Sequence, residues 1–170
     1  YSGGEGNALQ LASGQAKIQE ISSLLDSGAL DSAVGTFPTG RISPNEFFTG
    51  AKSTFIGSMQ NLLEGLTFDK LQEAKSKGIT FGALSDPERE AVAAAATKLN
   101  SPAWTIRDKA GNITGWRVKE DVFKAELDKI NNFAKLDFIL KGGNPEAVDV
   151  QEMDDGTLWT KNSDGTFTQI

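Results

Sequence analysis

The sequence predicts an α+β protein that is predominantly helical, and three observations support this class. Apolar residues recur at steps of three and four over several long stretches, which is the spacing of one buried helix face. Two of these stretches open with a serine followed three residues later by glutamate, the pattern of a helix capping box. Later in the chain, β-branched and aromatic residues flank short Gly, Asn and Asp turns, as in hairpins. We expect a helical bundle, then a β-hairpin, a long helix and a small C-terminal β-hairpin.

The N-terminal region is expected to begin with a flexible linker over residues 1–14, because Tyr1–Gly6 is glycine-rich and carries no basic or apolar signal region. The chain opens with tyrosine, so we expect a fragment or a processed product. Isoleucines and leucines then predict a helix over about 15–25, and a structured loop follows over 31–42, where glycine and proline recur.

Two capped helices are predicted next. Ser43–Glu46 is a capping box with proline at the first helical position, and it opens a helix that runs to Leu66. Its broad apolar face must be buried and consists of Phe47, Phe48, Ala51, Phe55, Met59, Leu62, Leu63 and Leu66. Thr67 is expected to cap a shorter helix that ends at Gly78.

A second capping box, Ser85–Glu88, predicts a helix that ends at Asn100–Pro102. The alanine-rich face of this helix permits close approach of a neighbouring helix. Residues 79–84 precede the box and contain too much glycine for a helix, so we expect a connector whose Ile79, Phe81 and Leu84 enter the core.

The C-terminal part of the chain has a different residue composition, with segments rich in β-branched and aromatic residues. Segments 104–106 and 113–118 predict a hairpin, and 120–141 predicts a long helix closed by two glycines, with inward-facing apolar residues that include Val122 and Leu140. An Asp-Gly-Thr sequence at residue 155 recurs at residue 164 and predicts turns of a second hairpin, which must pack on a body because an isolated hairpin is marginal in water. We therefore divide the chain into a linker (1–14), a helical domain (15–102), a hairpin and long helix packed on that domain (103–143) and an acidic β tail (144–170).

Composition excludes several classes of function. The 170 residues include no cysteine and no histidine, which removes disulfides, thiolate zinc sites, cysteine nucleophiles and the commonest general base. The formal net charge of −6 argues against sequence-independent binding of nucleic acid. No apolar run is long enough for a transmembrane segment, and neither acidic turn supplies the spaced ligands of a calcium loop. We expect no cofactor and no metal.

Two sets of residues remain as candidates for chemistry or binding. A carboxylate-only glycosidase is compatible with the composition, and its candidate acids are Glu46, Glu64 and Glu88, although two of these already serve capping boxes. Aromatic residues of the predicted strands fill cores more often than they form recognition surfaces, but they also anchor protein partners. The candidate interaction residues are Trp104, Trp116, Trp159 and Phe167.

One part of the chain resembles a known family. Leu71–Lys75, Gly78–Glu88 and Ala95–Leu99 form a helix, a lysine-rich glycine turn, a Thr-Phe-Gly-x-Leu-Ser-Asp-x-Glu sequence and an alanine-rich helix. This order resembles virion proteins of tailed bacteriophages, of the tape-measure or genome-ejection type. Residues 33–42 and 47–66 are similar to what precedes it there, so the resemblance covers about residues 18–99.

The resemblance implies a non-enzymatic structural segment of a phage virion, in the tail or the ejection apparatus, assembled in the host cytoplasm. Its expected partners are copies of itself or other virion proteins, because such parts need packing surfaces rather than catalytic groups. The alternative is a peptidoglycan-directed module, either a lytic domain that uses carboxylates or a wall-binding appendage that uses the hairpin tryptophans.

Overall fold

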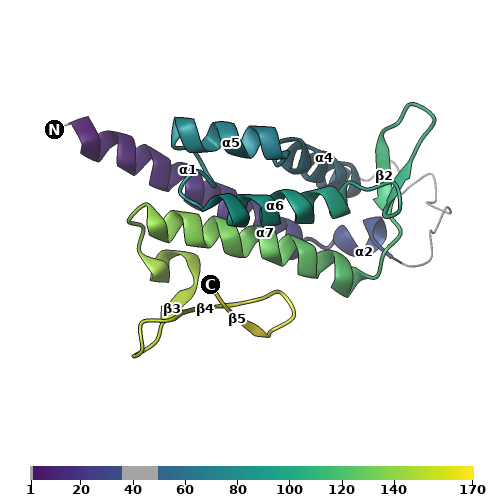
Figure 1. Ribbon diagram of the computed structural model, residues 1–170. Coiled ribbons are helices and arrows are strands. Elements are labelled where there is room, and N and C mark those ends of the chain that lie inside the picture. The colour runs from purple at the N-terminus through teal and green to yellow at the C-terminus, as the bar shows by residue number, and fades with distance from the viewer. Residues whose placement is uncertain (1, 36–49) are drawn as a thin grey trace.

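The computed structural model describes residues 2–35 and 50–170, with side chains from residue 8 onward. Within these ranges the fold is α+β, as predicted, with a helical body, a two-stranded antiparallel sheet and a three-stranded antiparallel sheet. Figure 1 shows the long helices running along the body and the larger sheet on one side of it. The elements are α1 (Ser2–Leu25), α2 (Leu30–Ala33), α4 (Gly50–Glu64), α5 (Phe68–Lys77), α6 (Asp86–Leu99), β1 (Thr105–Arg107), β2 (Ile113–Trp116), α7 (Glu120–Leu140), the 3₁₀ turn η1 (Pro145–Val148), β3 (Val150–Glu152), β4 (Leu158–Lys161) and β5 (Phe167–Gln169).

The linker predicted over residues 1–14 is wrong for residues 2–14, because α1 begins at Ser2 and includes them. Leu11 packs against the core, and Gly14 lies so close to Phe138 that a Cβ atom there would be 3.7 Å from the ring. Tertiary contact of this kind stabilises a helix whose glycines alone would disfavour it.

The predicted helix ends are largely confirmed where the structure describes them. The Thr67 hydroxyl accepts the N–H of Lys70 at 3.4 Å, and α5 ends at Gly78 in the left-handed conformation (φ 67°). The capping box of Ser85 and Glu88 is present in both directions. The loop predicted over 31–42 begins instead with the end of α2, followed by buried Val34, which bridges to Trp116. Residues 36–42 of that loop, the capping box at Ser43 and the aromatic pair after it lie outside the described residues.

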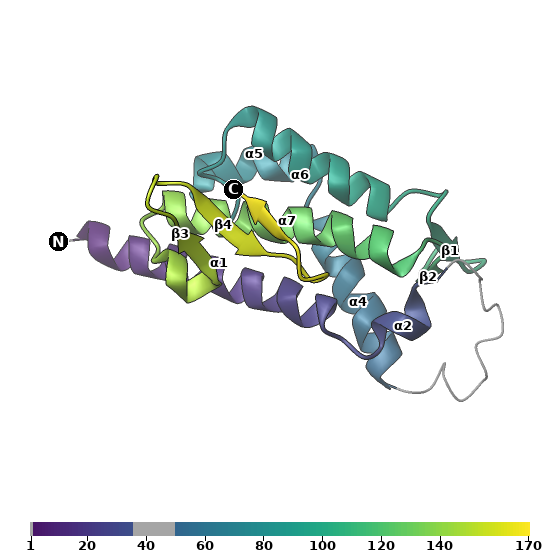
Figure 2. The same ribbon diagram turned by 90° about the horizontal axis from the view of Figure 1, so that it is seen from below.

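Helix α7 occupies the centre of the body, between α1 and α6 (Figure 2). Its buried apolar side chains follow the predicted helical spacing and are Phe123, Leu127, Ile130, Ala134 and Phe138. The predicted inward positions Val122 and Leu140 are wrong, since their side chains are 38% and 55% exposed. In the connector before α6, Phe81 and Leu84 are buried as predicted, whereas Ile79 is half-exposed.

The first hairpin is fixed to this body by tryptophan. Trp116 is 1% exposed and packs edge-on against Phe55 and Phe123, with ring centroids 6.1 Å and 5.3 Å away. Its indole N–H donates to the carbonyl of Leu99 at 2.7 Å, so the polar atom of this buried ring is satisfied. The rings and the hydrogen bond join β2 to α4, α6 and α7.

The C-terminal unit is a three-stranded meander in the order β3–β4–β5, and β3 was not predicted. Each Asp-Gly-Thr sequence makes the same turn. Asp155 and Asp164 each accept hydrogen bonds from the N–H and hydroxyl of the threonine two residues later, and the intervening glycines have φ of 84° and 88°. The repeated sequence therefore specifies two equivalent turns.

We predict that Phe123→Ala lowers the free energy of unfolding by about 3–5 kcal/mol, because it empties the centre of the aromatic cluster. The adjacent Val122→Ala is the matched control and should cost less than about 1 kcal/mol, since that side chain is 38% exposed and lies outside the aromatic cluster. Urea unfolding followed by circular dichroism measures both. Equal losses would show that the cluster is not the centre of the core.

Candidate functional site

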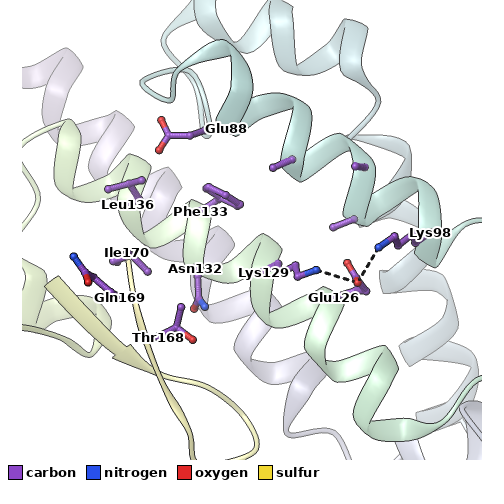
Figure 3. Close-up of a pocket in the computed structure, with 13 residues that line it drawn as sticks. Glu88, Lys98, Glu126, Lys129, Asn132, Phe133, Leu136, Thr168, Gln169 and Ile170 are labelled. Carbon is purple, nitrogen blue, oxygen red and sulfur yellow. Dashed lines mark hydrogen bonds and ion pairs between the residues drawn. The ribbon is translucent and has the colours of Figure 1, made fainter.

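An apolar groove of about 550 Å³ opens between α6, α7 and the end of the chain after β5 (Figure 3). Charged side chains lie at its two ends and apolar ones between them. The apolar lining consists of Ala91, Ala94, Ala95, Phe133, Leu136 and Ile170. A surface of this composition is suited to an apolar segment of a protein.

The α6 wall is formed by the alanine-rich face predicted from the sequence. Ala91 and Ala94 are exposed, while Ala95 is buried against the body. Their methyl groups leave the helix backbone close to the groove surface, so another helix can approach closely.

The position of α6 depends on the connector before it. Buried Arg89 donates to the carbonyls of Gly82 and Leu84 and pairs with Asp86. From α7, the carboxylate of Asp137 accepts the N–H of Ala83 at 2.8 Å. The connector is therefore bonded to both helices that form the groove.

The α7 wall lies at the edge of the helix face that enters the core. Phe133 and Leu136 are half-buried, because each is rotated around the helix axis away from the face that carries the fully buried Ile130 and Ala134. Helical geometry therefore gives the groove an apolar floor without removing side chains from the core.

The third wall is held in place by polar contacts between α7 and the C-terminal sheet. The Asp128 carboxylate accepts the N–H and hydroxyl of Ser163 at 3.1 Å and 2.6 Å. Lys135 donates to the Thr160 hydroxyl at 2.8 Å, in a buried position. The N–H of Ile170 donates to the carbonyl of Leu158 at 2.9 Å, which places the end of the chain along the groove.

The two ends of the groove carry opposite charge. At one end, Glu126 is nearly buried and contacts both Lys98 (3.5 Å) and Lys129 (3.2 Å), so this end has an excess of one positive charge. At the other end, Glu88 accepts the N–H of Ser85 at 2.9 Å and pairs with no described cation. The groove is thus polarised along α6.

Burial shifts the pKa values of Asp128 and Lys135, the two α7 side chains that bond the C-terminal sheet. Removal of Asp128 from water raises the pKa of its carboxyl group, despite the hydrogen bonds from Ser163 that lower it. Burial likewise lowers the pKa of Lys135, against the attraction of Asp149 and Asp128. Both charged forms are therefore disfavoured by the fold, and the sheet is held by groups that titrate abnormally.

The structure separates the four predicted interaction residues. Trp116 is 1% exposed in the core, where it packs against Phe123. Its predicted role in contacting a partner is therefore wrong. Trp104 is half-buried on the hairpin and packs against the core. Trp159 is half-buried and Phe167 is 62% exposed, and these two alone share a surface.

That surface is a shallow hollow of about 540 Å³ on the outer face of the C-terminal sheet. Trp159 is opposite Gln151 in the strand register, and Lys161 is opposite Phe167, so these side chains lie on one face. The other face carries Val150 and Thr160, which are buried.

Of the candidate carboxylates, the structure places Glu88 in the lining of the groove. Glu46 lies outside the described residues, and Glu64 is exposed at the end of α4. Among the residues described, no three carboxylates are grouped so as to hold a metal ion. None of the described helices is long and apolar enough to cross a membrane.

Comparison of the chain with protein-family models, curated proteins and solved structures found no match.

We predict that the stabilising effect of Asp128, relative to Asp128→Asn, falls as the pH rises from about 3 to about 6. The folded state binds the proton of Asp128 more tightly than the unfolded state, whose pKa is near the ordinary value of 3.8, so stability is lost as the group ionises. Asparagine keeps an oxygen acceptor for Ser163 but does not titrate.

The measurement is urea unfolding of both proteins across this pH range, in which groups that do not interact with Asp128 cancel in the difference. A difference that rises with pH, or that does not change, would contradict the assignment of a raised pKa.

Proposed function

We propose that the chain is a non-enzymatic structural segment of a phage virion, in the tail or ejection apparatus, and that it acts by packing against other protein chains. The observation that carries this proposal is the open apolar groove between α6 and α7. Burial of such a surface by another chain is favourable, because it removes apolar area from water.

The virion context comes from the resemblance over about residues 18–99, and the structure relates that region to the groove. The most distinctive part of the resemblance, Gly78–Glu88, forms the connector and the capping box that set the start of α6. Arg89 and Asp137 then hold this connector in place. Residues that carry the resemblance thus position one wall of the proposed packing surface.

We predict that the protein associates in solution and that Ala94→Arg weakens the association at least about tenfold, because a long charged side chain would fill the groove. Ala16→Arg is the matched control, since Ala16 is an exposed alanine within helix α1 and lies away from the groove lining. Light scattering over a concentration series measures the mass of each protein.

The wild type and the control should exceed the chain mass of 18.2 kDa increasingly with concentration. A constant mass of one chain for all three proteins would reject the packing function.

A peptidoglycan-directed module is the second candidate, and the hollow beside Trp159 favours it. An aromatic ring next to amide, carboxylate and ammonium groups is the arrangement with which proteins hold polar ligands that also have apolar faces, such as sugar rings. The Trp159 N–H donates to the Thr157 hydroxyl at 2.9 Å, which orients the ring.

For this second candidate, the protein should pellet with purified peptidoglycan, and Trp159→Ala should weaken binding at least about tenfold. Phe68→Ala is the control, because Phe68 is 40% exposed on α5, on the opposite side of the body from the sheet (Figure 1). Absence of pelleting by the wild type, or equal binding by the three proteins, would reject this candidate.

A further inference from the structure

We infer that the occupant of the groove is helix α6 of a second copy of this chain, packed antiparallel to the first about a two-fold axis. This inference rests on the proposed packing function and names the partner and its orientation. In such a pair, the α6 helix of each copy lies in the groove of the other, so one interface covers two apolar grooves.

The groove face of α6 is a single helical stripe with charge at its ends. Glu88 and Lys98 both line the groove, and Ala91, Ala94 and Ala95 lie between them. Ten residues of helix separate the two charges, which is about 15 Å along the axis. The stripe therefore begins with an anion, ends with a cation and is apolar in between.

Antiparallel pairing matches these charges, and parallel pairing does not. An antiparallel second copy places its Lys98 beside Glu88 and its Glu88 beside Lys98, which gives two equivalent ion pairs across the axis. A parallel copy places glutamate against glutamate and lysine against lysine. The order of charges along α6 thus selects one orientation.

Lys98 is able to make this second contact. Its present partner, Glu126, also contacts Lys129 at 3.2 Å, so Glu126 keeps a cation when Lys98 turns toward a second carboxylate. Lys98 is 57% exposed and has the freedom to reorient.

The apolar part of the stripe fits a close helix pair. Alanine side chains permit helix axes to approach to about 8 Å. At that distance the second copy would also cover Phe133 and Leu136 on α7 and the end of the chain at Ile170, which are the larger apolar groups of the groove.

The absence of cysteine makes a cross-linking test clean. The axis passes near residue 93, midway between the two charges, so Ala94→Cys places two thiols next to each other in the antiparallel pair. Mild oxidation of this variant should give a disulfide-linked dimer of twice 18.2 kDa. The matched control, Ala16→Cys, should form no disulfide-linked dimer under the same oxidation.

The orientation is tested with two further single-cysteine variants, Glu88→Cys and Lys98→Cys. Oxidation of their mixture should give at least about tenfold more dimer than either variant alone. In the antiparallel pair, residue 88 of one chain lies beside residue 98 of the other, whereas the two copies of residue 88, and the two copies of residue 98, are far apart. Circular dichroism checks that each variant keeps the wild-type fold and unfolding transition.

Each alternative outcome overturns the inference. Dimers from Glu88→Cys alone would indicate parallel pairing. Association by light scattering without a disulfide at residue 94 would reject the antiparallel α6 pair, and the proposed packing function would survive if Ala94→Arg still weakened that association. Constant monomer mass together with no cross-linking would reject both.

Discussion

Helix α7 is packed between α1 and α6, and the hairpin, the connector before α6 and the C-terminal sheet all contact it. Phe123, near the start of α7, completes the aromatic cluster that holds the hairpin. Asp137, near its end, is fully buried, pairs with Lys141 at 2.8 Å and bonds the connector that leads to α6. Helix α7 therefore positions both the hairpin and α6, which forms the opposite wall of the groove.

The same helix also carries the C-terminal sheet, but by a different kind of interaction. The apolar face of α7 enters the core, whereas Asp128 and Lys135 bond the sheet through hydroxyl and amide groups. Buried charges of this kind contribute less net stability than apolar packing, but they fix register and orientation. The sheet also contributes buried Val150 to the main core, and its hydrogen bonds place Ile170 along the groove.

Local signals predicted the parts of the fold that local interactions decide. Capping residues such as Thr67 and Ser85 satisfy N–H groups within a few residues of themselves, so their role can be read from sequence. The start of α1 and the strand β3 could not be predicted, because they depend on contacts with distant residues such as Phe138 and Thr160. The sequence pointed to close helix approach along α6, but the groove needed Phe133 and Ile170 to be brought there by the fold.

Hydrogen exchange at two protein concentrations would show whether the α6–α7 groove is a packing surface. We expect slower amide exchange over residues 88–98 and 168–170 at the higher concentration, with no change in α5, which does not line the groove. Exchange that is independent of concentration throughout the chain would contradict the claim, as would protection confined to the outer face of the C-terminal sheet around Trp159 and Phe167.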